Sequence, residues 1–216
     1  MKKALIPMVV AFALFTYGSY VGLVVLPPAV EPILHNNYRI LFFHLPSAIT
    51  AYTAFTVTLV TSVTYLIKRD EKYDIVSVSS AKAGFFMITA ALISGSIWAK
   101  AAWGAYWNWD PRETTVLILW AAYSAYFAIR ASIDEPSEKA KVSSVLAILC
   151  YATIPLSYLS TKLFFSLHPT TSSLQIGFNV GRALGPMILA FLLMYASFMI
   201  VDVRLSEIER ELEVGY

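Results

Sequence analysis

Six long apolar stretches constrain this chain more than any other feature of its sequence. Each comes close to the roughly 20 residues that a helix needs to cross a hydrocarbon core of ~30 Å. Because backbone groups in lipid must find partners within their own segment, the stretches are predicted to be helices. With 58% hydrophobic and 14% charged residues, residues 1–216 are expected to form one all-α integral membrane domain, a six-transmembrane-helix bundle. The predicted spans are about 4–26, 40–67, 83–103, 114–131, 142–163 and 185–203.

The distribution of Lys and Arg predicts which span ends face the cytoplasm, because cationic loops stay preferentially inside. With the N-terminus inside, 11 of the 16 Lys and Arg residues fall on the inner side. Both termini are therefore expected in the cytoplasm, with charged inner loops at 68–82 and 131–141 and a polar helical extension at 206–213. The protein is expected in the cell membrane. Five cationic residues remain outside: Arg39, Lys100, Arg112, Lys162 and Arg182.

The sequence lacks the features of a cleaved signal peptide, a nucleic-acid-binding protein, an ATPase and a Cys-x-x-Cys protein. The first apolar stretch ends in Leu26-Pro27-Pro28 without a small-residue cleavage site, so it is expected to remain as a helix. A formal net charge of +2 is too small to indicate nucleic acid binding. Without a Gly-x-x-x-x-Gly-Lys-Ser/Thr loop, any ATP hydrolysis is expected in a partner. The single cysteine, Cys150, lies in an apolar span and belongs to no Cys-x-x-Cys motif.

A tryptophan-rich segment at 98–114 lies between the third and fourth spans, on the predicted outer side, and holds four of the five tryptophans. It ends in a predicted helix start, with Asp110 as N-cap, Pro111 at the first helical position and Glu113 closing a capping box. An interfacial aromatic belt would explain tryptophans alone. The crowding of large rings on a glycine-containing loop favours instead a surface for a flat, largely apolar ligand such as haem. The rings are those of Trp103, Tyr106, Trp107 and Trp109.

All three histidines also fall on the outer side. His44 lies in Phe-Phe-His-Leu-Pro early in the second span, and His168 follows Phe-Phe-Ser-Leu beyond the fifth. A lone histidine at a helix end is commonly a satisfied polar residue. Two imidazoles from opposite sides, however, give a six-coordinate haem, and His44 and His168 are the predicted pair. His35 lacks aromatic neighbours and ranks third.

Haem also carries two propionates, which need positive partners at the membrane edge. Arg39 and Arg112 are the best placed, with Lys100, Lys162 and Arg182 behind them. The alternative for each is that its side chain extends to the lipid headgroups.

The run Trp-Gly-Ala-Tyr-Trp-Asn-Trp-Asp-Pro-Arg-Glu-Thr at 103–114 resembles the WWD signature of the haem-handling proteins of cytochrome c maturation, a superfamily that includes CcmC, CcmF and CcsA. The short plan, with one histidine on either side of the motif, is most similar to CcmC. The resemblance implies that His44 and His168 are the axial ligands of a transiently held haem b. It further implies that the loop contacts the haem, giving a candidate site of Arg39, Trp103, Gly104, Tyr106, Trp107, Trp109, Asp110, Arg112 and Glu113.

The resemblance implies a haem-delivery subunit rather than an enzyme. Haem would pass to the periplasmic chaperone CcmE, while the ABC transporter subunits CcmA and CcmB, with the small CcmD where present, would supply energy. Membrane lipid is the remaining partner. One departure is that Asp-Pro-Arg-Glu-Thr reads closer to the CcsA and CcmF version of the motif than to the Asp-Ala-Arg of many CcmC proteins.

Three other functions remain open on the sequence. A CcsA-like cytochrome c synthase subunit would be expected to have more spans and a further histidine pair. A b-type cytochrome that carries electrons across the bilayer usually places histidines deep in facing spans. A transporter or scaffold that binds no haem would use the tryptophans only as a belt.

Overall fold

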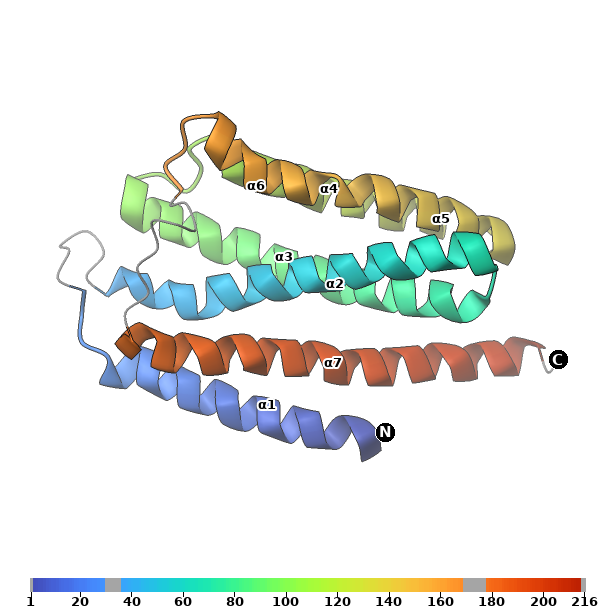
Figure 1. Ribbon diagram of the computed structural model, residues 1–216, viewed down its shortest axis with the longest axis horizontal. Helices are drawn as coiled ribbons and strands as arrows, with labels where there is room; N and C mark the ends of the chain where they lie inside the picture. Colours follow the sequence, from blue (N-terminus) through green and yellow to red (C-terminus); the bar gives the residue numbers. More distant parts are fainter. Residues whose placement is uncertain (1, 30–35, 169–177, 215–216) are drawn as a thin grey trace.

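The computed structural model describes residues 2–29, 36–168 and 178–214, which form a bundle of long, roughly parallel helices (Figure 1). Within these residues, six segments are helical, long and apolar enough to cross a membrane, which confirms the predicted all-α six-span fold. The two termini lie at the same end of the bundle (Figure 1). The segments are Lys3–Val25, Asn37–Lys68, Glu71–Trp103, Pro111–Ala131, Pro136–Leu163 and Asn179–Leu212.

Local sequence explains where the helices stop and break. The first span ends in a short π-helix, and a 3-10 turn leads into the second. The fifth span is split at Ala152, because the ring of Pro155 collides with the carbonyl of Tyr151 four residues earlier. The elements are α1 (Lys2–Tyr20), η1 (Val21–Val25), η2 (Asn37–Ile40), α2 (Leu41–Lys68), α3 (Glu71–Trp103), α4 (Pro111–Ala131), α5 (Pro136–Tyr151), α6 (Thr153–Leu163) and α7 (Phe178–Val214).

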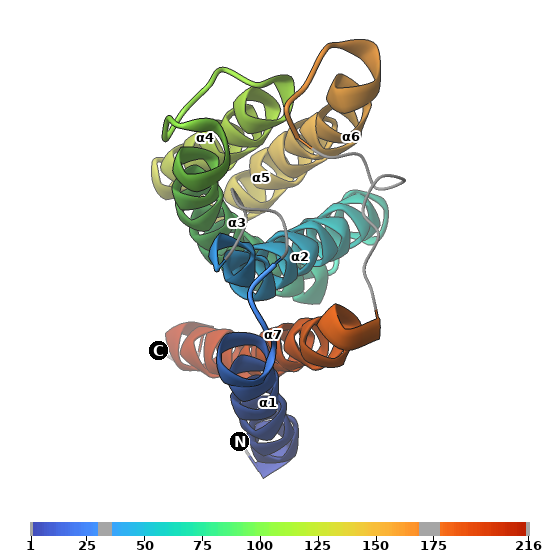
Figure 2. The same ribbon diagram turned by 90° about the vertical axis from the view of Figure 1, so that its left-hand side faces the viewer.

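The helices pack in three groups, with α2 and α3 in the middle (Figure 2). Helices α1 and α7 pair on one side, and α4 with the α5–α6 span covers the other (Figure 2). Helices in lipid associate through close packing rather than water exclusion. Accordingly, buried alanines line the interface of α2 with α3, and the Phe55 ring of α2 stacks on Tyr123 of α4 at 3.8 Å between centroids. Hydroxyl bonds link α2, α3 and α7, such as Ser80 to Tyr195 at 2.7 Å.

The inner loops are shorter in the structure than the predicted 68–82 and 131–141, so the predicted loop bounds were wrong. Residues 71–82 belong to α3, and α5 already begins at Pro136. Hydropathy finds only the lipid-facing part of a helix, whereas polar caps extend both helices beyond it. The Asp70 side chain accepts a hydrogen bond from Lys72 N at 3.0 Å, and Glu135 accepts from Ser137 N and Glu138 N at 3.2 and 2.6 Å. The predicted polar extension at 206–213 is confirmed as the end of α7.

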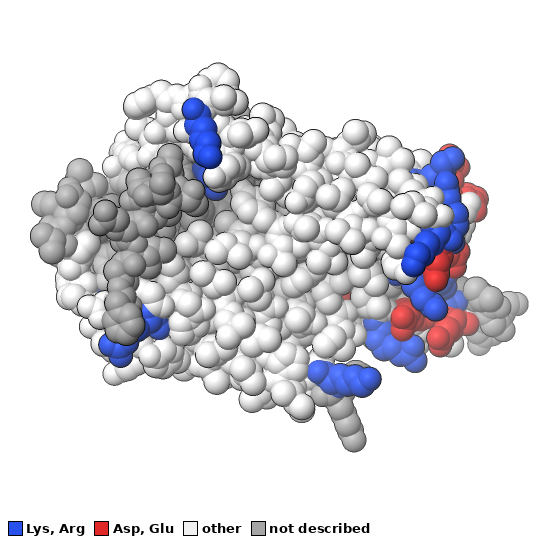
Figure 3. All heavy atoms as spheres, viewed as in Figure 1, with Lys and Arg blue, Asp and Glu red and all other residues white. Residues whose placement is uncertain are grey.

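Charged side chains gather at the end that carries the termini. Figure 3 shows blue and red atoms together at this end and an almost uncharged flank between the ends. Ion pairs join neighbouring helices there, including Lys82 with Asp202 at 3.1 Å. At the opposite end, Asp110 and Glu113 are the acidic residues of the described chain, beside five cationic ones. We call the end with the termini the inner end and the opposite one the outer end.

Candidate functional site

The tryptophan loop, residues 104–110, connects α3 to α4 at the outer end. Helix α3 ends at Trp103, and Gly104 caps it with a φ of +86°, a conformation that glycine adopts without strain. Two side chains of α3 hold the loop backbone. Ser96 Oγ donates to Tyr106 O at 2.6 Å, and Lys100 Nζ donates to Gly104 O at 2.8 Å. The loop is therefore fixed to the helix that precedes it.

The loop displays its aromatic rings rather than burying them. Trp109 is 75% exposed and Tyr106 60%, while Trp103 and Trp107 are half-buried. The Trp107 and Trp109 rings meet edge to face at 6.0 Å between centroids. Trp109 has a φ of +56°, which is unfavourable for a bulky residue. The exposed indole is therefore held in a strained backbone.

The helix start at Asp110 is as predicted, but the capping box is not. Asp110 is the N-cap and accepts from Arg112 N at 2.8 Å. Glu113 was expected to accept from the backbone N–H of the N-cap; its Oε2 instead accepts from Asn108 N at 2.9 Å. The left-handed turn at Trp109 redirects the chain, so that the N–H of Asn108 lies within reach. Glu113 therefore fixes the loop from its C-terminal side.

Asp110 also joins the tryptophan loop to the segment that carries His168. Its side chain is buried, and Oδ2 accepts from Ser166 Oγ at 2.8 Å and from Leu167 N at 2.7 Å. Burial by itself raises the pKa of Asp110, but the hydrogen bonds from Ser166, Arg112 N and Leu167 N outweigh it and hold the pKa below its usual value. The carboxylate is therefore ionised at neutral pH.

His168 lies directly after these contacts. Its backbone N–H donates to Ser166 Oγ at 3.1 Å, and its ring meets the Trp103 ring edge-on at 6.5 Å between centroids. The structure thus brings the predicted second histidine against the tryptophan loop, although 64 residues separate Trp103 from His168 in sequence.

His44 lies in the first turn of α2 and packs against α3. Its Nδ1 is 3.0 Å from Ala91 O and 3.2 Å from Ser94 Oγ. Because a carbonyl oxygen can only accept, this contact assigns the proton to Nδ1 and leaves the lone pair on Nε2. Gly95 makes the close approach possible, since a Cβ there would lie 3.0 Å from His44 Cε1. A hydrogen bond from the second ring nitrogen to a carbonyl is typical of metal-ligating histidines.

The two histidines lie in one region with Arg112. Helix α3 relates them, because Ser94 contacts His44, Ser96 holds the tryptophan loop and Trp103 meets the His168 ring. The guanidinium of Arg112 forms no hydrogen bond or ion pair with a described residue. Within the described ranges, no group of three or more His, Cys, Asp or Glu is placed to hold a bare metal ion. His35 lies outside the described residues.

Arg39 is engaged at the end of the first span. Its Nη1 donates to Gly22 O at 3.1 Å and to Leu23 O, its Nη2 donates to Leu26 O at 2.9 Å, and its Nε donates to Asn36 Oδ1 at 3.2 Å. Four of the five N–H groups of a guanidinium are therefore used, mostly on carbonyls that the ending helix leaves without partners. The two predicted arginines therefore differ, because the Arg112 guanidinium has no hydrogen-bond partner among the described residues and the Arg39 guanidinium has four.

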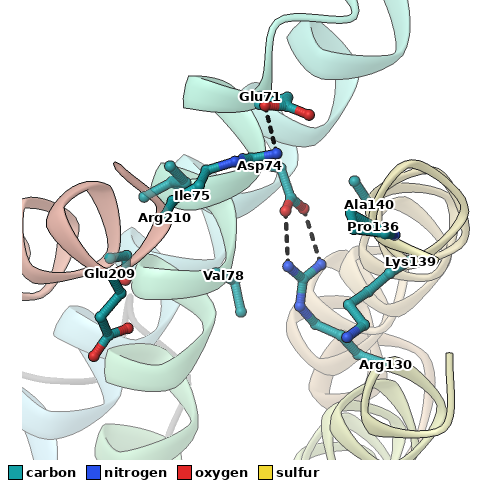
Figure 4. Close-up of a pocket in the computed structure, with 11 residues that line it drawn as sticks. Glu71, Asp74, Ile75, Val78, Arg130, Pro136, Lys139, Ala140, Glu209 and Arg210 are labelled. Carbon is teal, nitrogen blue, oxygen red and sulfur yellow. Dashed lines mark hydrogen bonds and ion pairs between the residues drawn. The ribbon is translucent and has the colours of Figure 1, made fainter. Parts of the chain in front are cut away.

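A second polar feature, at the inner end, has a structural explanation. A cleft of about 360 Å³ lies between α3, α4, α5 and α7, and four of its charged residues form ion pairs across it (Figure 4). Arg130 forms a bidentate ion pair with Asp74 at 2.9 and 2.7 Å, and Arg210 pairs with Glu71. Opposite charges that neutralise each other across a cleft favour no particular ligand. The tryptophan loop remains the candidate site.

Sequence reasoning missed three small residues that shape the site. Ser166 connects Asp110 to His168, Gly95 admits the His44 ring, and Ser96 holds the loop. The run Ser94-Gly95-Ser96 within an apolar span was a usable signal, because small residues mark close approach between membrane helices. Nothing local marked Ser166, whose partner Asp110 is 56 residues away.

Comparison with known proteins shows the family of the chain. A family model described as heme exporter protein C matches residues 1–214. The heme exporter protein C of Rhodobacter capsulatus is 33% identical over 147 residues, covering 67% of this chain and 60% of that protein. That of Paracoccus denitrificans is 36% identical over 111 residues, covering 51% and 46%. A cytochrome c biogenesis protein CcsA of Synechococcus sp. is 39% identical over 94 residues, covering 42% and 31%. The chain spans about half the length of the curated exporter relatives it matches.

Proposed function

Because the chain belongs to the heme exporter protein C family, we propose that it holds haem at the outer face of the cell membrane and delivers it to a periplasmic haem chaperone. The inner end, with its termini and its excess of charged residues, is then cytoplasmic. Haem is the cargo, held non-covalently as haem b. The protein itself makes and breaks no covalent bond in this proposal.

In the proposed site, His44 and His168 are the two axial ligands of the iron. The bond from Nδ1 of His44 to Ala91 O supports this role, because it leaves the Nε2 lone pair for a metal and fixes the ring orientation. His168 approaches from the segment that follows α6, next to Trp103. Histidines on two separate elements can coordinate one iron from opposite sides.

The rings of the tryptophan loop, together with Trp103 at the end of α3, would pack against the porphyrin. Trp103, Trp107 and Trp109 provide flat apolar area, and Tyr106 adds a ring at the same edge. A guanidinium is a strong bidentate partner for a carboxylate, so we assign a propionate to Arg112. Arg39 could add only the one N–H that its carbonyl contacts leave.

The proposed partners follow from the family resemblance. The recipient of haem is CcmE, and CcmA and CcmB, with CcmD where present, supply the energy of release. Exposed rings at the outer end support a hand-over there, because a ligand that lies on a surface is accessible to a second protein. Lipid surrounds the spans.

The single observation that carries the proposal is the convergence of His44, His168 and the tryptophan loop at one end of the bundle, through their contacts with α3 and Asp110. The test is a visible absorption spectrum, oxidised and dithionite-reduced, of the purified protein with added hemin. The wild type is expected to give a low-spin, six-coordinate spectrum. His44→Ala and His168→Ala are expected to lose it or become high-spin, whereas His35→Ala keeps it. An unchanged spectrum in both of the first two variants would contradict the ligand assignment.

A CcsA-like cytochrome c synthase subunit is the second candidate, favoured by the match to a CcsA protein over 94 residues. The two functions differ in chemistry, because a synthase forms thioether bonds between haem and cysteine thiols. Incubation of the haem-loaded protein with a reduced Cys-x-x-Cys-His peptide separates them. We expect no covalent haem–peptide product. Formation of this product faster than in a mixture of the peptide with free haem would favour the synthase.

A further inference from the structure

Asp110 is the point at which two distant parts of the candidate site meet. The tryptophan loop and α4 come from the middle of the chain, and the segment Ser166–His168 follows α6. A single buried carboxylate receives hydrogen bonds from both sides. Oδ1 accepts from Arg112 N, and Oδ2 accepts from Ser166 Oγ and Leu167 N.

These contacts give Asp110 a role other than ligand binding. The side chain is 4% exposed, and both oxygens already have donors within the protein. A capping carboxylate needs only one oxygen, and capping alone leaves the second unexplained. That second oxygen is what reaches Ser166, whose hydroxyl in turn accepts from His168 N at 3.1 Å.

We propose that Asp110 is a positioning residue that clamps the Ser166–His168 segment to the tryptophan loop and so places His168 for its role as second haem ligand. This inference rests on the proposed function. It assigns to the aspartate of the motif an action through His168 rather than on haem itself.

The chemistry of the clamp requires a carboxylate. Oδ2 accepts from one O–H and one N–H at once, which a carboxylate oxygen does well. In Asp110→Asn, the carbonyl oxygen can still cap α4, because Asn is as good an N-cap as Asp. Its NH₂ group would then face the N–H of Leu167, two donors against each other. The variant that keeps the cap therefore loses the acceptor for Leu167 N, and its NH₂ group can replace the lost bond only by donating to Ser166 Oγ.

Three further variants isolate the clamp. Ser166→Ala removes the link to His168 without any change of charge, and Ser166→Thr restores a hydroxyl. Asp70→Asn is the matched control, because Asp70 caps α3 at the inner end through Lys72 N and is exposed. All variants are made in the full chain, and their elution from a sizing column and helical circular dichroism are compared with the wild type.

The readout is the spin state of bound haem in the hemin-loaded protein, with and without added imidazole. Loss of a hydrogen bond to a charged group is expected to lower the equilibrium constant for ligation of the iron by His168 on the order of tenfold. Asp110→Asn and Ser166→Ala should therefore become high-spin with His44 still bound. Added imidazole should return both variants to low spin by binding the iron at the coordination position that His168 has left. Ser166→Thr and Asp70→Asn should stay low-spin without it.

The outcomes separate this inference from the proposed function. A wild type without six-coordinate haem overturns both. A six-coordinate wild type with unchanged Asp110→Asn and Ser166→Ala spectra overturns the clamp alone. A high-spin Asp110→Asn beside a normal Ser166→Ala supports the clamp and assigns it to the Leu167 N–H, because that hydrogen bond survives in Ser166→Ala. If Asp110→Asn fails to fold, Ser166→Ala decides the test.

A second measurement needs no haem. Hydrogen exchange of a peptide spanning 163–168 reports the Leu167 and His168 N–H groups, which the clamp protects. This peptide should exchange on the order of tenfold faster in Asp110→Asn than in wild type and be unaffected in Asp70→Asn. Equal exchange in wild type and Asp110→Asn would overturn the clamp.

Discussion

Replacement of Gly95 by alanine tests the most exacting contact of the site, the packing of His44 against α3. A Cβ at residue 95 would lie 3.0 Å from His44 Cε1, 3.4 Å from Nδ1 and 3.9 Å from Nε2. Ordinary van der Waals contact begins near 3.4 Å, so the ring must retreat by a few tenths of an ångström. That movement lengthens the 3.0 Å bond from Nδ1 to Ala91 O, which orients the imidazole.

The expected effect on haem binding exceeds the effect on folding. Alanine improves helix propensity by ~1 kcal/mol relative to glycine, which offsets part of an overpacking strain of ~1–3 kcal/mol. The net loss of stability in Gly95→Ala should therefore stay below ~2 kcal/mol. Disturbing the partner of a metal-ligating histidine typically lowers affinity 10–100-fold. Because the bond is strained rather than removed, we expect a loss near the lower limit, about tenfold.

The assay is titration of the purified protein with hemin, followed at the Soret band, beside thermal unfolding. Gly181→Ala is the matched control, because Gly181 lies in α7, also near the outer end, and a Cβ there meets nothing within 4 Å. The control should bind haem like the wild type and be slightly more stable. If Gly95→Ala binds haem within twofold of Gly181→Ala, the argument that this packing orients a haem ligand is refuted.

Three other substitutions give distinct outcomes. Arg39→Gln should lower the unfolding temperature and cost ~1–3 kcal/mol of stability, because it removes donors from the carbonyls that end the first span, and the folded protein should bind haem with unchanged affinity. Weaker haem binding at full stability would instead assign Arg39 to a propionate. Arg112→Gln should reduce haem affinity on the order of tenfold in a hemin titration and keep the six-coordinate spectrum. An affinity equal to that of the wild type would contradict the propionate assignment. Arg130→Met should destabilise the protein by ~3–5 kcal/mol in denaturant titration, because it leaves the Asp74 carboxylate buried without a partner, and the double variant with Asp74→Asn should recover much of that stability. An unchanged stability of Arg130→Met would show that the pair is hydrated.

The parts of the molecule that could be predicted are those set by local sequence. Six spans followed from hydropathy, and the start of α4 followed from Asp110 and Pro111, which the structure confirms as N-cap and first helical residue. The capping box failed because its geometry depends on the backbone before the cap. The positive φ of Trp109 leads Glu113 to Asn108, and no propensity scale predicts that conformation for tryptophan.

The contacts that make the site a unit are long-range and had no local signature. The partner of Arg39 was expected to be a haem propionate, yet carbonyls 13–17 residues earlier take most of its donors. The partner of His44 lies 47 residues away on α3. Sequence can nominate chemically apt residues, but which of them are already satisfied by the fold depends on how helices meet. The assignment of His44 and His168 to haem stays a prediction.

The strained Trp109 has a consequence for protein engineering. Position 109 combines a left-handed backbone with a 75% exposed indole, so a procedure that maximised stability alone would choose glycine there. Relief of a left-handed conformation in a bulky residue is worth ~1–2 kcal/mol. A thermostabilised variant of this protein selected without regard to its cargo would therefore tend to lose this ring early. Stabilisation for structural work should keep Trp109 and place the stabilising substitutions on the lipid-facing surfaces of the spans.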